Sequence, residues 1–236
     1  MARAVDDTAE EAAARAAALA TLTRIHGGLR LLHGSLRAEL PEQLMAVRFL
    51  RPSSTVLELG GNVGRNSCVI GRLLARSSDL VVVESDPVIA EQLTQNRDAN
   101  HLAFHVVAAA LSKRPLIQRD WITSPHDATT PVPEGWKAVP TITWAALRER
   151  FPKHAFDTLV ADCEGALYYI LLDEPTFLDG FQTVIMENDY QVAEHKTKVD
   201  EELRRRGFAR VYVERGGWKS SPCPCAECFF ECWRKK

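Results

Sequence analysis

Apolar residues occur in two patterns that alternate along this chain, and these patterns predict its secondary structure. Short apolar runs with β-branched and aromatic residues predict seven strands, at residues 55–59, 80–84, 103–111, 156–162, 181–188, 208–214 and 227–233. Apolar residues at helical spacing predict helices at residues 8–25, 41–49, 63–75, 87–100, 143–151, 164–172 and 192–206. The segment 113–140 is polar and proline-rich, which predicts a loop or a small excursion.

The order of these elements predicts the fold class. Strands that alternate with helices are typical of βαβ units and a parallel sheet. The last two predicted strands have no helix between them, so they should form an antiparallel hairpin. Asp86 and Pro87 are expected to begin one helix, and Gly207 to end another. We therefore predict one α/β domain over residues 51–236, with an N-terminal helical extension over residues 1–50.

Length and charge narrow the classes of function. With 236 residues the chain can form one large domain, and its net charge of -2 gives no overall attraction to nucleic acid or to an anionic membrane. No apolar run reaches the roughly 18 residues of a spanning helix. The alanine-rich start carries acidic residues before its apolar part, unlike a secretory signal. The composition predicts a soluble cytoplasmic protein without nucleic-acid or membrane partners.

The run VLELGGNVGRNS, residues 56–67, carries the main chemical signal. Its glycines allow positive φ and a close approach of a ligand to the backbone. The run matches neither the dinucleotide fingerprint G-x-G-x-x-G nor a P-loop. Glu84 ends the next strand, where a carboxylate can accept hydrogen bonds from a ribose diol. S-adenosylmethionine, an adenosine ligand without a pyrophosphate, suits both features, and Glu58 would favour its sulfonium cation; the alternative is a turn that only packs helix on strand.

Three segments in order resemble the class I S-adenosylmethionine-dependent methyltransferases, and more narrowly the FkbM family. They are VLELGGNVGRNS, VVVESDPVIAEQLTQNRDAN and the run from ITWAALRERF to FQTVIMEN, and the likeness spans residues 50–215. The resemblance implies a Rossmann-like fold with a seven-stranded, mostly parallel sheet in the order 3-2-1-4-5-7-6. The methyl-donor site that it implies comprises Glu58, Gly60, Gly61, Asn62, Gly64, Asn66, Glu84, Ser85, Ala109 and Asp162. The catalytic residues that it implies are Asp162, Glu164 and Glu187.

The resemblance also implies a reaction, the O-methylation of a hydroxyl group on a sugar or another small natural-product-like acceptor. The sulfonium is already activated, so the enzyme mainly aligns an oxygen with the methyl group and removes its proton. Two positions depart from the family pattern: Gly60-Gly61 replaces Gly-Ala, and Asp189 stands where the family often has His. The second departure leaves the general base unassigned.

Other functions stay open at the level of the sequence. A non-catalytic scaffold subunit would bind the same adenosine ligand without turnover. A nucleotide-dependent oxidoreductase is disfavoured by the imperfect dinucleotide fingerprint. A macromolecular acceptor, RNA or protein, is a further alternative, although the lack of a basic face counts against RNA.

Several polar residues near the predicted strand ends have two interpretations. Asp162, Glu187 and Asn188 carry hard oxygen donors and are similar in type and position to the ligands of metal-dependent O-methyltransferases of this fold, which makes Mg²⁺ a candidate cofactor. Alternatively, Asp162 and Glu187 only cap helices or bind the donor's tail. Glu164 is a candidate base or a helix N-terminal acid, and His195 is a candidate base or an exposed surface residue.

Four cysteines crowd the end of the chain: Cys223, Cys225, Cys228 and Cys232. Four thiolates can bind zinc, but the spacing C-x-C-x2-C-x3-C is not a standard zinc motif. We predict instead that Cys228, Phe230 and Cys232 share one face of the last strand, with both cysteines packed in the core.

Three tryptophans, Trp121, Trp136 and Trp144, flank or lie within the proline-rich segment. They either stack on an acceptor ring or pack on the surface of the excursion. We expect this segment and the N-terminal helices to form the walls of the acceptor pocket.

Overall fold

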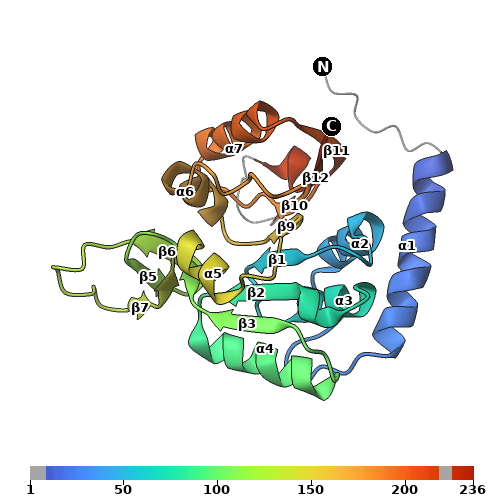
Figure 1. Cartoon of the computed structure of the whole chain (residues 1–236), viewed down its shortest axis with the longest axis horizontal. Helices are drawn as coiled ribbons and strands as arrows, with labels where there is room; N and C mark the ends of the chain where they lie inside the picture. The colour runs from blue at the N-terminus through green and yellow to red at the C-terminus, as the bar shows by residue number, and fades with distance from the viewer. Residues whose placement is uncertain (1–8, 218–224) are drawn as a thin grey trace.

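A seven-stranded sheet forms the centre of the computed structural model, which describes residues 9–217 and 225–236 (Figure 1). Its strands are β1 (Val56–Leu59), β2 (Leu80–Glu84), β3 (His105–Ala108), β9 (Thr158–Ala161), β10 (Thr183–Glu187), β11 (Phe208–Glu214) and β12 (Phe230–Lys235). Their spatial order is β3-β2-β1-β9-β10-β12-β11; β12 is antiparallel to both neighbours and the other pairs are parallel. The predicted strand order and the terminal hairpin are therefore confirmed.

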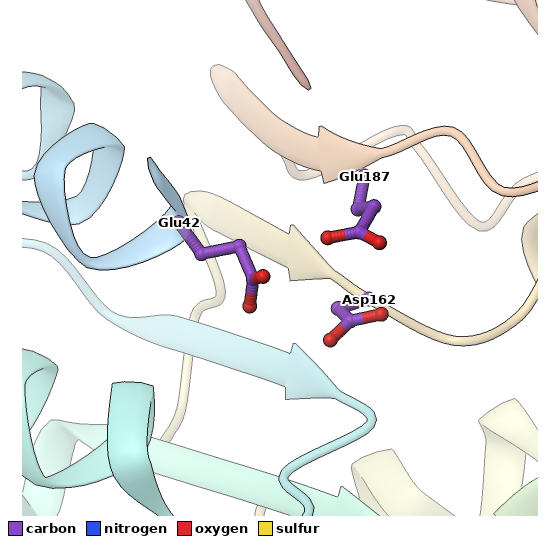
Figure 2. Close-up of side chains that lie close together, drawn as sticks. All are labelled: Glu42, Asp162 and Glu187. Carbon is purple, nitrogen blue, oxygen red and sulfur yellow. The ribbon is translucent and has the colours of Figure 1, made fainter. Parts of the chain in front are cut away.

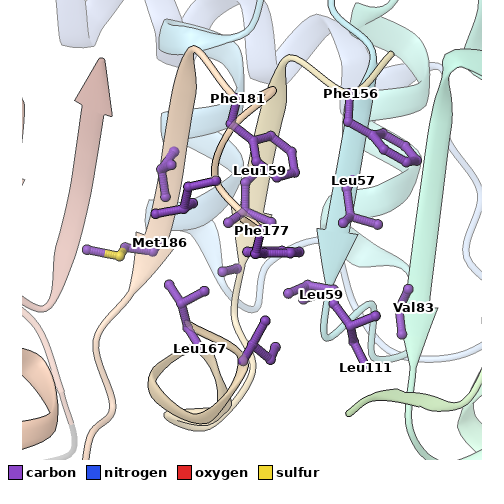
Figure 3. Packing of buried hydrophobic residues seen from close by; sticks show 14 of the residues in the cluster. Leu57, Leu59, Val83, Leu111, Phe156, Leu159, Leu167, Phe177, Phe181 and Met186 are labelled. Carbon is purple, nitrogen blue, oxygen red and sulfur yellow. The ribbon is translucent and has the colours of Figure 1, made fainter. Parts of the chain in front are cut away.

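Helices cover both faces of this sheet. They are α1 (Ala9–Gly27), α2 (Leu40–Phe49), α3 (Arg65–Leu73), α4 (Pro87–Ala99), α5 (Trp144–Arg150), α6 (Ala166–Asp173) and α7 (Ala193–Arg205). Because successive strand residues point to opposite faces, Leu57 and Leu59 of β1 pack with α5, α6 and α7, whereas Val56 packs with α2, α3 and α4. Figure 3 shows the first of these two cores. Among the described helices, none has the length and apolar character needed to cross a membrane.

The two predicted helix ends are also found. The Asp86 carboxylate accepts a hydrogen bond from the Val88 amide at 2.9 Å and so caps α4, with Pro87 as the first helical residue. Gly207 follows α7 with φ 84°, the left-handed conformation that commonly ends a helix. The Asp86 cap fixes where β2 passes into α4 at the carboxyl edge of the sheet, whereas Gly207 lies where α7 passes into β11.

Residues 113–140, predicted as a loop or a small excursion, form an excursion from the main sheet, but its strands were not predicted. The segment contains a three-stranded antiparallel sheet, β5 (Leu116–Arg119), β6 (Ile122–Pro125) and β7 (Lys137–Val139), in the order β6-β5-β7. A second pair, β4 (Ala110–Leu111) with β8 (Thr141–Ile142), joins this insert to the end of β3, so the predicted strand 103–111 is divided. These strands have two to four residues and are half exposed, which leaves no clear alternation in the sequence.

The cysteine tail differs from its prediction at one position. Cys228 lies in a 3₁₀ turn, η2 (Ala226–Cys228), before β12 begins, so it does not share a strand face with Phe230 and Cys232. Cys232 is fully buried among the side chains of the α2–α4 face, as predicted, whereas the half-buried Cys228 packs against the opposite core. Cys223 lies outside the described residues.

Candidate active site

The glycine turn brings bare backbone to the carboxyl end of β1. Gly60 has φ 84°, and a Cβ atom there would lie 1.5 Å from the Asp162 carbonyl oxygen, so this position requires glycine. The Gly60 amide donates a hydrogen bond to the Val83 carbonyl at 2.9 Å. Asn62 follows with φ 47°. The turn is thus held between the ends of β2 and β9, at the edge where ligands bind in open α/β sheets.

Glu84 is fixed beside this turn at the end of β2. Its carboxylate accepts hydrogen bonds from the backbone amides of Asn62 and Asp86, both at 2.8 Å. The side chain is 7% exposed, and burial raises its pKa above the ordinary value, against the effect of these two bonds. An ionised carboxylate has about four acceptor positions, so the two amides orient Glu84 without using its full capacity.

An open cleft lies over the turn. Its empty space, including the open mouth, is about 770 Å³. The predicted residues that line it are Gly60, Asn62, Glu84, Ser85, Ala109, Asp162 and Glu164. The other wall comes from the insert and α6, with Leu116, Gln118, Trp121, Thr123, Ala166 and Ile170. No residue of α1 or α2 lines the cleft, although both were expected to wall the acceptor pocket.

Four other predicted donor-site residues support the turn from beneath and do not line the cleft. Glu58 is 2% exposed, and burial raises its pKa to about 8, against the effect of the Ser67 and Asn66 side chains. Gly61 faces away, because a Cβ atom there would meet Val82 at 2.3 Å. Gly64 is the N-cap of α3, with φ 87°, and Asn66 is buried in the first turn of that helix.

Three carboxyl groups from separate elements meet next to the cleft. Glu42 of α2, Asp162 after β9 and Glu187 at the end of β10 have carboxylate oxygens within 4.8 Å of one another. Figure 2 shows the three side chains pointing toward one another. Burial first, and then mutual repulsion, raises the pKa of Glu42 and of Asp162, and burial raises the pKa of Glu187 to about 7. Asp162 is the member of this group that also lines the cleft.

Sequence reasoning missed Glu42 and proposed Asn188 in its place. The signal for Glu42 was slight, a buried acid in the first turn of α2. Asn188 is fully buried, and its side-chain amide donates to the Cys228 carbonyl at 2.6 Å. The structure therefore brings Asp162 and Glu187 together with Glu42, while the Asn188 amide nitrogen binds the C-terminal segment.

Glu164 forms a second carboxyl pair with Asp189. Desolvation, together with a hydrogen bond shared with Asp189, raises the pKa of Glu164 to about 9. Two carboxyl groups can share a hydrogen bond only when one of them holds a proton. Glu164 has φ 52° and precedes the N-cap Gly165 of α6; it is an exposed residue that lines the cleft.

Three other candidate residues lie away from the cleft. His195 is half-buried and stacks on Tyr168, with ring centroids 3.9 Å apart, so it is not the exposed surface residue that we expected. Trp144 is buried in the α5 core and contacts Phe177 edge to face. Trp136 lies beneath the Arg119 guanidinium, 4.9 Å from its ring centroid. Of the three tryptophans, Trp121 lines the cleft.

Comparison with known proteins agrees with this architecture. No family model and no curated protein matches the chain. A protein of the NADB-Rossmann superfamily from Streptococcus agalactiae matches with TM-score 0.51 and 11% identity, over 87% of this chain and 70% of that one. A Streptococcus pneumoniae protein provisionally assigned as a tRNA (m1A22) methyltransferase matches with TM-score 0.50 and 14% identity, over 86% and 71%. The O-methyltransferase from Bacillus cereus in complex with SAH has TM-score 0.45 and 12% identity, over 95% and 91%. The chain has the Rossmann-like α/β fold found in the two streptococcal proteins.

Proposed function

We propose that this protein is an S-adenosylmethionine-dependent methyltransferase. One observation carries the proposal. A single cleft is lined by residues of the glycine turn, the ends of β2 and β3, and the loop after β9, and one of these residues, Asp162, belongs to the group of three carboxyl side chains. Glu84 is oriented for a ribose diol, and the bare backbone at Gly60 allows the donor's amino-acid part to approach closely. The carboxyl groups beside Asp162 favour a sulfonium cation.

The same residues can assist methyl transfer. The bound donor supplies an activated methyl group, and this chain has to align an acceptor oxygen with it and accept a proton. Glu187 is our candidate for the proton acceptor: its carboxylate lies within 4.8 Å of that of Asp162, which lines the cleft, and a base with a pKa of about 7 is available in its ionised form near neutral pH. Asp162 and Glu164 would position the acceptor, since both line the cleft next to this group.

For the acceptor we propose a hydroxyl group on a sugar or a similar small molecule, as in the FkbM-like enzymes that the sequence resembles. The support is the order of the motif residues along the chain and the recessed position of the three carboxyl groups, of which Glu42 is buried and Asp162 and Glu187 are half-buried. RNA or protein acceptors and a non-catalytic scaffold are the competing proposals, and they predict different results with labelled donor.

The first experiment is calorimetric titration of the protein with S-adenosylhomocysteine. Glu84→Ala should weaken binding by about tenfold or more, since hydrogen bonds to a charged group contribute about 1.5–3 kcal/mol. Glu91→Ala is the matched control, because Glu91 is exposed on the neighbouring α4 and should leave the affinity unchanged. A folded protein that does not bind, or a Glu84→Ala variant that binds like the control, would overturn the donor site.

Methyl-labelled donor then distinguishes the acceptors. Label transferred to hydroxylated small molecules supports the proposed reaction, and label transferred to RNA or protein contradicts the small acceptor while leaving the donor site in place. Donor binding without transfer to any of these acceptors supports the scaffold.

A divalent cation is a second proposal, carried by the group of Glu42, Asp162 and Glu187. Their oxygens come from three elements and lie within 4.8 Å of one another, and carboxylate oxygen is the ligand that Mg²⁺ prefers. These residues fit a cation, which would lower the pKa of an acceptor hydroxyl. We expect calorimetry to detect Mg²⁺ binding that Glu42→Gln weakens and that the exposed-site variant Glu149→Gln on α5 does not. Equal binding by both variants would exclude this group as the metal site.

A further inference from the structure

The insert of residues 110–142 contacts the loop after β2 through one pair of facing residues in its small sheet. Gln118 of β5 and Lys137 of β7 are direct partners in the register of these strands. Gln118 reaches Ser85 and Lys137 reaches Asp86, the two residues that follow Glu84. This pair of residues therefore binds two consecutive residues of the loop after β2, directly after Glu84, the residue that we propose binds the ribose.

Gln118 is a buried polar side chain in the wall of the cleft. It is 5% exposed, it donates to the Asp120 carbonyl at 2.9 Å, and it accepts from the Ser85 hydroxyl at 3.4 Å. A glutamine amide has two donor hydrogens and two acceptor lone pairs, so each end of this amide retains capacity for a ligand. The bond to Asp120 fixes the orientation of the amide.

Lys137 anchors the same part of the insert to the body of the protein. Its ammonium group lies 2.5 Å from the Asp86 carboxylate, and the hydrogen bond and charge of Lys137 help lower the pKa of Asp86 against the effect of burial. Asp86 also caps α4 through the Val88 amide. The insert is thus tied to the element that positions Glu84.

Trp121 stands at the turn between β5 and β6. It is 56% exposed and lines the cleft, whereas its neighbour Ile122 is 54% exposed and does not line it. A large aromatic ring beside an open cleft offers a flat apolar surface, on which a purine can stack. Ile122 provides an internal control, because it has the same exposure on the same hairpin.

We propose that residues 116–123 of the insert form the outer wall of the donor site and bind the nucleoside half of the donor. Trp121 covers the purine, and Gln118 hydrogen-bonds the polar edge of the nucleoside. Lys137 is a positioning residue that acts through Asp86. The inference rests on the proposed function, and it assigns nucleoside recognition to a segment outside the main sheet.

Calorimetric titration with adenosine and with S-adenosylhomocysteine tests this wall. Trp121→Ala should weaken both ligands by about tenfold or more, because base stacking on an aromatic side chain is worth about 1–3 kcal/mol. Gln118→Leu should weaken both ligands by a similar factor for each, since the contact lies on their common half. Ile122→Ala should bind both ligands like the wild type, and thermal unfolding of each variant shows that it is folded.

The outcomes separate this inference from the proposed function. If the wild type binds neither ligand, the proposed donor site is wrong, and the proposed role of residues 116–123 is wrong with it. If the wild type binds and Trp121→Ala binds as tightly as Ile122→Ala, the donor site stands and the wall is overturned. A loss for S-adenosylhomocysteine without a loss for adenosine would also overturn it, since the contact would then lie on the amino-acid half.

Discussion

Gly60 shows how much a single residue decides at this site. Its φ of 84° is the same as that of Gly207, but only at Gly60 would a Cβ atom meet backbone, at 1.5 Å from the Asp162 carbonyl oxygen. At Gly207 no atom lies within 4 Å of that Cβ position. A substitution at Gly207 therefore measures only the cost of the left-handed backbone conformation, whereas one at Gly60 adds the cost of the steric clash.

We predict that Gly207→Ala lowers the free energy of unfolding by about 1–2 kcal/mol, the cost of the left-handed conformation alone. Gly60→Ala should lower it by about 3 kcal/mol or more, because the strands must also separate. Urea unfolding followed by circular dichroism measures both. Equal losses would mean that β9 shifts easily away from the turn, and that close approach is not what requires glycine at position 60.

The sequence predicted the residues of this site wherever the signal is local. Gly60, Asn62 and Glu84 stand at strand ends that the apolar runs already mark, so their convergence on one edge follows from a parallel sheet. Glu42 could not be found in this way, because its helix precedes the sheet and only tertiary packing of α2 brings it to Asp162. Gln118 was missed for the same reason, since no strand was predicted in the insert.

Strand β12 carries a charged side chain, Glu231, that is buried in the core. Glu231 is fully buried between β10 and β11, and it pairs with Lys196 of α7 at 3.0 Å and with Arg210 at 2.6 Å. The Trp233 indole donates to the same carboxylate at 2.9 Å. These contacts fasten α7 and the edge strand β11 to β12.

Glu231→Ala should lower the free energy of unfolding by about 3 kcal/mol, because it removes a fully buried carboxylate that pairs with the buried Lys196 and the half-buried Arg210, and leaves Lys196 with Asp200 alone. Glu227→Ala is the control: its carboxylate pairs with Arg215 at 2.6 Å, but both side chains are more than 70% exposed, so the loss should stay below about 1 kcal/mol. Urea unfolding of the two variants gives the comparison. Similar small losses would mean that the buried network adds specificity and little stability.

The secondary-structure predictions were confirmed for the strands that are completely buried. The strands β1, β2 and β9 are buried along their whole length, and their continuous apolar runs identify them as strands of a parallel sheet. The insert strands are short and half exposed, and Cys228 lies in a turn that the apolar run ECFFECW conceals. Partial burial leaves a weak pattern, so these elements could not be predicted from spacing alone.

Across the whole molecule, buried carboxyl groups near the carboxyl edge of the sheet link stability to pH. Burial raises the pKa of Glu58 from 4.5 to about 8 and that of Glu187 from 4.5 to about 7. Between the unfolded and folded values the folded state holds more protons, so stability must fall as pH rises through this window. Asp86 and Asp173, whose pKa values are lowered in the folded state, act in the opposite sense, and their contribution is lost as the pH falls below about 4.

We therefore expect maximal stability on the acid side of neutrality and a decline toward pH 8. Each buried carboxyl contributes a slope of up to about 1.4 kcal/mol per pH unit within its window. Glu58→Gln removes one such group, so between pH 5 and pH 8 its free energy of unfolding should decline less steeply than that of the wild type, by up to about this slope. Glu149→Gln, at an exposed position of α5, should follow the wild type. Urea unfolding at several pH values measures the three curves, and a Glu58→Gln curve parallel to the wild type would show that this carboxyl keeps its ordinary pKa in the folded protein.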